Sequence, residues 1–351
     1  MREMSGGKNA RPSGGKDMEE NMNSPTSVTE TRHPSPVTRH DAKPKIAVYW
    51  TGSCGGCDVS FLEVGEAIVE VLSRVEIVFW PALADAKRSD LEALPPGYID
   101  VALINGVIRT EENREMAELL RAKSKYVVAY GACAHLGGIP SLANKWGKEE
   151  IFRTVFGPGF RPASPLDGNG EARLPDLTER AMPLEDVVRV DYVVPGCPPP
   201  APLIARFFEA LLSGEMPEPP YVFANVKALC EECPRVRHDD RRIERIVRPH
   251  EIVPDPEVCL LEQGLICMGP VTRGGCNALC PAAGMPCTGC LGPTPEAGDP
   301  GAAMLSALAS LVRFEDEGEE YFAREDEVLE ALADPLGTFY MYSTGKYRRK
   351  R

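Results

Sequence analysis

Cysteine is the residue type in this sequence that could do chemistry, and its distribution is uneven. The chain has twelve cysteines. A lone cysteine is most often a small buried apolar side chain, but most of these lie in segments rich in glycine or proline. Thiolates gathered in such loops are typical metal ligands in a reducing compartment, where structural disulfides are rare. They stand at Cys54, Cys57, Cys133, Cys197, Cys230, Cys233, Cys259, Cys267, Cys276, Cys280, Cys287 and Cys290.

Composition limits the classes of function. The net charge of −13 argues against a nucleic-acid partner, which would need clustered Lys and Arg, and the basic tail from Lys346 to Arg351 is too short to change this. No apolar run reaches the roughly 20 residues that cross a bilayer. The first residues lack the apolar core of a secretory signal. We therefore expect a cytoplasmic protein with no direct membrane insertion.

The elements that must position the cysteines alternate along the chain. Apolar runs predict strands, and a helical spacing of apolar residues predicts helices between them. Strands that are apolar throughout and alternate with amphipathic helices indicate a parallel sheet covered on both faces, and we predict an α/β fold with a flavodoxin-like doubly wound sheet. The predicted strands are Lys45–Trp50, Val75–Trp80, Asp100–Asn105, Tyr126–Tyr130 and Asp191–Val194, and the predicted helices are Asp58–Ser73, Glu111–Lys123 and Pro202–Leu212.

Four regions follow from these patterns. Residues 1–43, rich in Gly, Ser, Pro and Thr, predict a disordered extension. Residues 44–225 hold the flavodoxin-like domain, and residues 226–294 form a loop-rich domain with eight of the cysteines. Residues 295–351 are expected to be a helical segment with a basic tail, and the acidic stretch Glu315–Glu320 is expected to be a solvated face.

Four cysteines follow predicted strands. Cys54 and Cys57 come after the first strand in TGSCGGC, Cys133 after YVVAY, and Cys197 after DYVV. Ligands of open parallel sheets bind at the carboxyl ends of the strands, so these loops should bring four thiolates to one edge. A single Zn²⁺ could take four cysteines, but a wide glycine-lined cup favours a cubane iron–sulfur cluster. A flavin phosphate in the first loop is disfavoured, because cysteines occupy the cradle.

The remaining eight cysteines divide into two sets of four. The segment has little apolar periodicity, so metal binding is expected to supply much of its stability. In chain order the sets are Cys230, Cys233, Cys259 and Cys267, and Cys276, Cys280, Cys287 and Cys290. Intercalated pairing, in which a cysteine ligates the other cluster as in bacterial ferredoxins, is an alternative, although the spacings differ from the ferredoxin run. Paired zinc knuckles are a second alternative.

Several long motifs now point to a family. The strings WTGSCGGCDVSFLE, INGVIRTEENREMAELLRAKSKYVVAYGACAHLGGIPSLAN, VPGCPPP and CLLEQGLICMGPVTRGGCNALCPAAGMPCTGCLGP occur in this order between Lys45 and Pro293. Together they resemble the small subunit of [NiFe] hydrogenases. Within that family the chain is most similar to the cytoplasmic group that passes electrons to methyl viologen or to heterodisulfide-reductase-type partners.

The resemblance implies a function in electron transfer through three [4Fe–4S] clusters, with no catalytic residue in this chain. It also implies a large subunit that carries the nickel–iron site and a further iron–sulfur or flavin protein as electron acceptor. The implied ligands are Cys54, Cys57, Cys133 and Cys197 for a proximal cluster, Cys276, Cys280, Cys287 and Cys290 for a medial one, and Cys230, Cys233, Cys259 and Cys267 for a distal one.

Two positions depart from the membrane-associated members of the family. Those members have histidine where this chain has Cys230, and they lack an equivalent of Cys280. Ligation by thiolates alone puts more negative charge on a cluster and favours low reduction potentials. The twin-arginine export signal of periplasmic members is also missing, which agrees with the expected cytoplasmic location.

Other polar residues near the cysteines have simpler interpretations. His135 could donate to a cluster sulfur, but an interface or partly buried histidine is the favoured interpretation. His238 is not needed as a ligand, because four cysteines fill that site. Asp58 and Glu63 could move protons, although solvated or capping carboxylates are more common.

Two other function classes stay open. One is an electron-transfer subunit of another oxidoreductase, such as the single-cluster subunit of respiratory complex I, which would have adjacent cysteines in its first motif and no eight-cysteine domain. The other is a zinc-stabilised interaction protein.

Overall fold

The computed structural model describes residues 43–159, 175–312, 326–328 and 330–347. All of them fall within one compact unit, Ala42–Arg351. The predicted extension, apart from its last residue, and the acidic stretch at 315–320 lie outside the described residues, as does the end of the basic tail. The limits predicted between the three remaining regions stay predictions.

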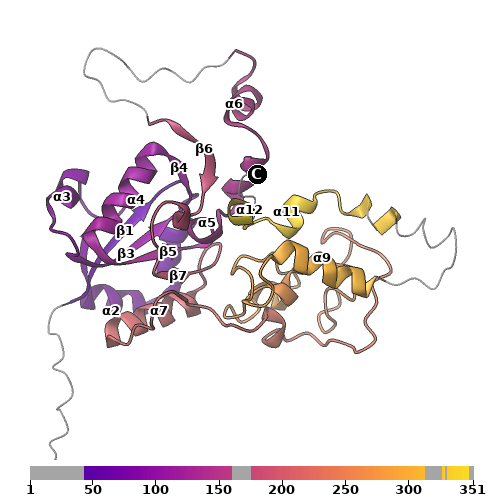
Figure 1. Cartoon of the computed structure of the whole chain (residues 1–351). Helices are drawn as coiled ribbons and strands as arrows, with labels where there is room; N and C mark the ends of the chain where they lie inside the picture. Colours follow the sequence, from indigo (N-terminus) through magenta and orange to yellow (C-terminus); the bar gives the residue numbers. More distant parts are fainter. Residues whose placement is uncertain (1–42, 160–174, 313–325, 329, 348–351) are drawn as a thin grey trace, which may run out of the picture. The chain divides into compact units, whose positions relative to one another are not determined.

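Six strands form one sheet in the order β2-β1-β3-β5-β7-β8 (Figure 1). All neighbouring strands run parallel. The first five in this order follow the flavodoxin-like arrangement, so the predicted fold class is confirmed. The sixth strand was not predicted, because its two residues are too few to form an apolar run. The strands are β1 (Lys45–Trp50), β2 (Glu76–Phe79), β3 (Ile99–Asn105), β5 (Ser124–Tyr130), β7 (Tyr192–Val194) and β8 (Tyr221–Val222).

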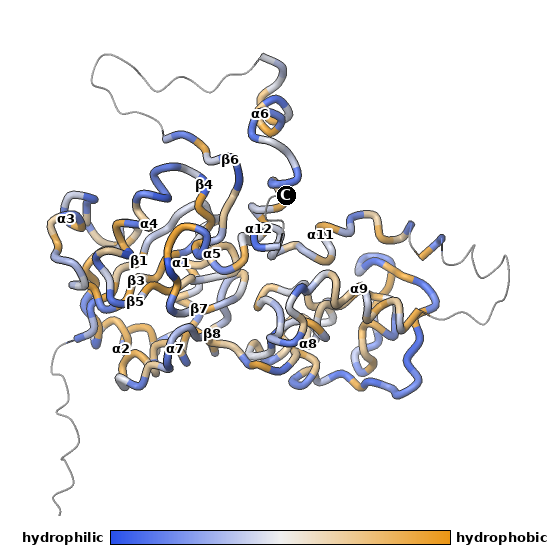
Figure 2. Tube along the Cα trace, in the orientation of Figure 1, coloured by the Kyte–Doolittle hydropathy of each residue, from blue (hydrophilic) through white to orange (hydrophobic). Residues whose placement is uncertain are grey.

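Helices cover both faces of this sheet (Figure 1). Helix α7 (Ala201–Ser213) packs over one face with Val48 and Leu103, and helix α4 (Glu111–Lys123) packs over the other with Ala102. Successive strand residues point to opposite faces, which is why neighbours such as Ala102 and Leu103 enter different cores. Helix α4 shows hydrophilic and hydrophobic colours along its length in Figure 2, as expected of a helix with one buried face.

The helix predicted over Asp58–Ser73 is wrong in one respect, because it is broken. Helix α1 (Gly56–Ser60) continues as the 3₁₀ helix η1 (Phe61–Val64), and α2 (Ala67–Arg74) begins after Gly65. Gly65 has φ +66°, a left-handed conformation that glycine adopts without a steric cost. Apolar residues on both sides of the break contact the same core, so their spacing continues across it.

Short elements complete the α/β part. Strand β4 (Ile108–Thr110) pairs antiparallel with β6 (Leu177–Met182) in a separate two-stranded sheet. The other elements are α3 (Arg88–Ala93), α5 (Ala132–Leu136), η2 (Ile139–Lys145), α6 (Lys148–Phe156) and η3 (Leu184–Asp186).

The cysteine-rich region contributes to a separate apolar core, which the sequence did not lead us to expect. Leu229, Leu260 and Leu265 are buried together with Met304 and Phe339 from later helices. The core was missed because residues outside the region complete it. The elements here are η4 (Leu229–Glu231), η5 (Gly269–Val271), α8 (Leu279–Ala282), α9 (Pro300–Leu311), α11 (Pro335–Phe339) and α12 (Thr344–Tyr347). Among the described helices, none has the length and apolarity to cross a membrane.

Candidate metal centres

The four cysteines predicted at the sheet edge do follow the carboxyl ends of three parallel strands of the sheet. Cys54 follows β1, Cys57 lies in α1, Cys133 lies in α5 directly after β5, and Cys197 follows β7. Cys57 and Cys133 are buried, whereas Cys54 and Cys197 are exposed. A group bound here would therefore have a protein side and an open side.

Their thiols interact with one another electrostatically. Burial raises the pKa of Cys57 far above its usual range, and negative charge on Cys133, Cys197 and Cys54 raises it further. Burial, followed by Cys197 and Cys54, raises the pKa of Cys133 to about 12. The structure thus brings the predicted four together. A bound metal centre would instead lower the pKa values of these thiols, because its positive charge favours the thiolates that coordinate it.

Glycines line the space beside these sulfur atoms. A Cβ atom added to Gly131 would lie 2.4 Å from the Sγ of Cys57, and one added to Gly138 would lie 2.4 Å from the Sγ of Cys133. Both glycines have positive φ, +88° and +56°. The backbone therefore leaves a cradle that side chains would fill. Such a cradle and four thiol donors fit an iron–sulfur cluster.

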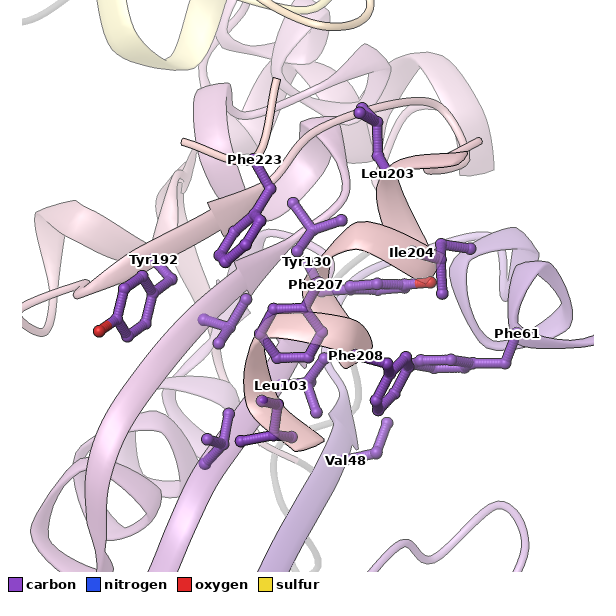
Figure 3. Packing of buried hydrophobic residues seen from close by; sticks show 14 of the residues in the cluster. Val48, Phe61, Leu103, Tyr130, Tyr192, Leu203, Ile204, Phe207, Phe208 and Phe223 are labelled. Atoms are coloured by element: carbon purple, nitrogen blue, oxygen red, sulfur yellow. The ribbon is translucent and has the colours of Figure 1, made fainter. Parts of the chain in front are cut away.

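Aromatic packing fixes the turn directly after α1, where Phe61 lies in the core with Tyr130 (Figure 3). The ring of Phe61 stacks on the ring of Tyr130, with centroids 4.7 Å apart. The Ser60 hydroxyl donates to the carbonyl oxygen of Cys57 at 2.7 Å and lies 2.9 Å from the Tyr130 hydroxyl. The turn that carries Cys57 is thus tied to the end of β5, the strand that leads directly into the loop of Cys133.

Asp58 has a structural role beside the same turn. Its carboxylate accepts hydrogen bonds from Nε1 of Trp80 at 3.0 Å and from Nδ2 of Asn105 at 2.8 Å. Both donors are neutral and belong to buried residues. They hold the first turn of α1 against the ends of β2 and β3, which agrees with the structural interpretation of this carboxylate.

The set predicted as distal lines a single cavity. Cys230, Cys233, Cys259 and Cys267 all contribute to its wall. Burial raises the pKa of Cys230 to about 12, with further increases from Cys267, Cys259 and Cys233. A Cβ atom on Gly269 would lie 3.3 Å from the Sγ of Cys230, so a glycine again gives the sulfur room.

A buried arginine lies in the wall of the same cavity. Arg235 is 7% exposed and donates to the carbonyl oxygens of Pro281 and Val258, both at 2.9 Å. These neutral acceptors orient the guanidinium without cancelling its charge. A buried cation is favourable only near negative charge, and four thiolates around a cluster would supply it.

The third set, the one predicted as medial, interacts with both of the other sets. Burial raises the pKa of Cys290 to about 12, and Cys276 and Cys280 add to the increase. Burial also raises the pKa of Cys287, and the next contribution comes from Cys267 rather than from Cys290. Cys287 therefore lies between the medial and distal sets.

Two interactions with sulfur mark the junctions between the sets. The backbone of Cys197 acts on the sulfur of Cys290 and lowers the pKa of that thiol, which is raised overall by burial. The backbone N–H of Cys287 donates to the Sγ of Cys267 at 3.3 Å. The three sets consequently follow one another in space in the order sheet edge, Cys276–Cys290, Cys230–Cys267.

Comparison with known proteins identifies the family. A model described as NADH ubiquinone oxidoreductase, 20 Kd subunit, matches residues 54–211. The iron–sulfur subunit of the F420-non-reducing hydrogenase of Archaeoglobus profundus is 41% identical over 286 residues, covering 78% of this chain and 89% of the relative. A subunit of the F420-non-reducing hydrogenase of Methanothermobacter thermautotrophicus is 40% identical over 303 residues, or 86% and 94% of the two chains. The chain belongs to the [NiFe] hydrogenase small-subunit family.

Members of this family are hydrogenase subunits that transfer electrons and associate with a large catalytic subunit. A solved NAD⁺-reducing [NiFe]-hydrogenase in the H₂-reduced state is 34% identical, and the match covers 50% of this chain and 94% of that one, with a TM-score of 0.42. The family model ends at residue 211, whereas the two F420-non-reducing hydrogenase relatives match long stretches of this chain.

Two histidines of this small subunit that lie close to cysteines in the sequence, His135 and His238, have other neighbours in the structure. Burial, followed by Lys346 and Arg273, lowers the pKa of His135 to about 3, so the imidazole is neutral. A Cβ atom on Gly292 would lie 3.3 Å from its Nε2, which places the ring beside the medial loop. His238 is exposed and its Nδ1 lies 2.6 Å from Glu262. Among the described residues, no three His, Cys, Asp or Glu side chains form a group that could hold a single metal ion.

Sequence reasoning missed two residues of this small subunit. Arg235 follows Cys233 by two positions, and Glu232 lies between Cys230 and Cys233. A charged residue in a cysteine loop is usually solvated, so nothing local distinguishes these two. The one signal was the density of charged residues next to the motif.

Proposed function

We propose that this chain is the electron-transfer small subunit of a cytoplasmic [NiFe] hydrogenase and relays electrons between the nickel–iron site of a large subunit and an acceptor through three [4Fe–4S] clusters. The observation that carries the proposal is the serial contact of the cysteine sets, with Cys197 beside Cys290 and Cys287 beside Cys267. Such clusters take up and release single electrons at potentials set by charge, hydrogen bonds to sulfur and exposure.

The proposed ligands are the three sets described above. Cys54, Cys57, Cys133 and Cys197 would hold the proximal cluster at the sheet edge. Cys276, Cys280, Cys287 and Cys290 would hold the medial cluster, and Cys230, Cys233, Cys259 and Cys267 the distal one. In this assignment the residues of the chain fix the order of the clusters and keep water from the buried thiolates. We also propose the domain limits 44–225 and 226–294, with the helical segment following.

The large subunit would cover the proximal edge. Four large apolar side chains at the end of β1 or in the elements that follow β1 and β5 are exposed: Trp50 (45%), Val59 (59%), Leu62 (69%) and Ile139 (48%). Exposed apolar side chains gathered beside a functional site are typical of a protein interface. The open side of the proximal set would then be closed by the partner.

Substitution in this surface tests the interface. Leu62→Glu places a charge among the four apolar residues and should abolish co-purification of a nickel-containing partner. Val69→Glu is the matched control, because Val69 is equally exposed (68%) but lies on α2. Loss of the partner from both variants, or from neither, would contradict the proposed docking surface.

Metal analysis tests the cofactors. Anaerobically purified complex should contain about twelve irons per chain, as three cubanes require, with broad absorbance near roughly 400 nm that bleaches on reduction. Stoichiometric zinc in place of iron would instead support a zinc-stabilised interaction protein. Iron without a nickel-containing partner would support a subunit of another oxidoreductase. The observation in favour of this alternative is the match of residues 54–211 to the NADH ubiquinone oxidoreductase model.

A further iron–sulfur or flavin protein is proposed to dock beside the distal set.

A further inference from the structure

Glu232 lies inside the Cys230-x-x-Cys233 motif but contacts the loop of another cysteine set. Its carboxylate accepts hydrogen bonds from the backbone N–H of Gly275 at 2.8 Å and of Cys276 at 3.1 Å, and the N–H of Ala278 lies at 3.4 Å. We propose that Glu232 is a positioning residue that fixes the medial cysteine loop to the distal one. The inference rests on the proposed function, because it concerns clusters bound by both sets.

The medial loop has a conformation that needs such support. Asn277 and Ala278 have φ of +56° and +50°, a left-handed conformation that is sterically unfavourable for residues with a Cβ atom. Strained backbone persists only where surrounding contacts determine it. The hydrogen bonds to Glu232 fall on both sides of Asn277, and bonds to an ionised acceptor are stronger than those between neutral groups. The carboxylate therefore holds the turn between Cys276 and Cys280.

The residues around the Glu232 carboxylate leave space for it. A Cβ atom on Gly274 would lie 2.9 Å from Oε2 of Glu232. Gly274 itself is fixed by two backbone hydrogen bonds, from its N–H to Lys227 and from the N–H of Asn225 to its carbonyl oxygen, both 2.9 Å. The Asn225 side chain donates to Oε2 at 3.1 Å. The backbone cannot move away easily, so glycine is what leaves room for the carboxylate.

The charge of Glu232 also has an electrostatic consequence. Its Coulombic effect reaches Cys276, one of the proposed medial ligands. A fixed negative charge disfavours the addition of an electron to a nearby cluster and so lowers its reduction potential. Glu232 thus acts on the medial set in two ways, by hydrogen bonding and by charge.

Four variants of the full chain, purified anaerobically in the complex, separate these effects. Glu232→Gln keeps an acceptor oxygen but removes the charge, so the medial reduction potential should rise while iron content stays complete. Glu232→Ala removes the acceptors, and Gly274→Ala displaces the carboxylate without changing its charge. Both should lose about four of the irons per chain, the content of one cubane.

Glu231→Gln is the fourth variant and the matched control, because the ion pair of Glu231 is a long one, 3.8 Å from Arg237, with both side chains exposed. It should leave iron content and the medial potential unchanged. The measurements are iron counts and a redox titration followed by electron paramagnetic resonance. If the wild type binds iron and the Glu232 variants have the same iron content and medial potential, the proposed role of Glu232 is wrong but the proposed function stands. A wild-type complex without iron would overturn the proposed function itself.

Discussion

Glycines beside the proximal cysteines have no Cβ atom and therefore leave room for the cysteine sulfur atoms. Gly131 has φ +88° and ψ 162°, and its added Cβ would meet the Sγ of Cys57 at 2.4 Å. Gly157 has nearly the same backbone, φ +93° and ψ 169°, with nothing within 4 Å of an added Cβ. The two glycines therefore share a backbone requirement and differ in the neighbouring sulfur.

This pair gives a prediction at the scale of the residue. Gly131→Ala should destabilise the protein by about 2–5 kcal/mol, from backbone strain and overpacking together, and should lower iron content. Gly157→Ala should cost only the strain, about 1–3 kcal/mol, with full iron content. Thermal unfolding and iron counts measure both. Equal iron contents in the two variants would show that the cradle does not depend on Gly131.

At the scale of the element, one buried carboxylate joins a helix and two strands. Asp191 lies directly before β7 with a fully buried side chain, and it accepts from the N–H of Val127 in β5 at 2.9 Å. It also pairs with Arg121 of α4 at 2.5 Å and with Arg189 at 2.7 Å. Burial alone would raise the pKa of Asp191, but these hydrogen bonds and charges lower it overall.

Asp191→Asn should therefore destabilise the α/β part by about 2–4 kcal/mol, because it leaves a partly buried arginine without its counter-charge. Since the folded pKa lies below the unfolded value of about 3.9, the stabilisation is complete above that pH and is lost as pH falls through the folded pKa. The difference in urea midpoint between variant and wild type should hence shrink below about pH 4.

An exposed ion pair in helix α2 is the control for Asp191. Glu70 and Arg74 lie 3.4 Å apart with side chains 72% and 50% exposed. Glu70→Gln should change stability by less than about 0.5 kcal/mol. A similar effect of both substitutions at neutral pH would contradict the role given to Asp191.

At the scale of the whole molecule, the segment of α11 and α12 joins distant parts of the chain. The N–H of Gly138, beside the proximal cysteines, donates to the carbonyl oxygen of Tyr342 at 2.9 Å. The N–H of Gly345 donates to the hydroxyl oxygen of Ser141 at 2.9 Å. The Tyr342 hydroxyl lies 3.2 Å from the hydroxyl of Thr288, which stands between Cys287 and Cys290. This segment thus contacts the loops of two cysteine sets.

Ser141→Ala should release part of this contact. Ser141 is fully buried, and its loss leaves the N–H of Gly345 without its acceptor, at a cost of about 1–3 kcal/mol. Iron release should begin at lower urea concentration than in the wild type. Ser310→Ala, at an exposed hydroxyl that bonds within α9, should leave the release curve unchanged. Identical curves for both variants would mean that the segment does not support the clusters.

The sequence by itself determined the fold class and the proximal cysteines. Buried strands of a parallel sheet are continuous apolar runs, and the loops after them meet at one edge, so Cys54, Cys133 and Cys197 could be placed together without coordinates. The order of the other eight cysteines along the chain suggested their division, and the family motifs added which set is medial and which distal.

Only the tertiary structure decided how the sets meet. The position of Cys287 beside Cys267, the hold of Glu232 on Gly275 and the docking of Gly345 on Ser141 are contacts between residues far apart in the chain. Such contacts leave no periodicity and no local motif, because a single side chain makes each of them. The break at Gly65 was hidden for a related reason, since the apolar pattern reports which face is buried and not whether the helix is continuous.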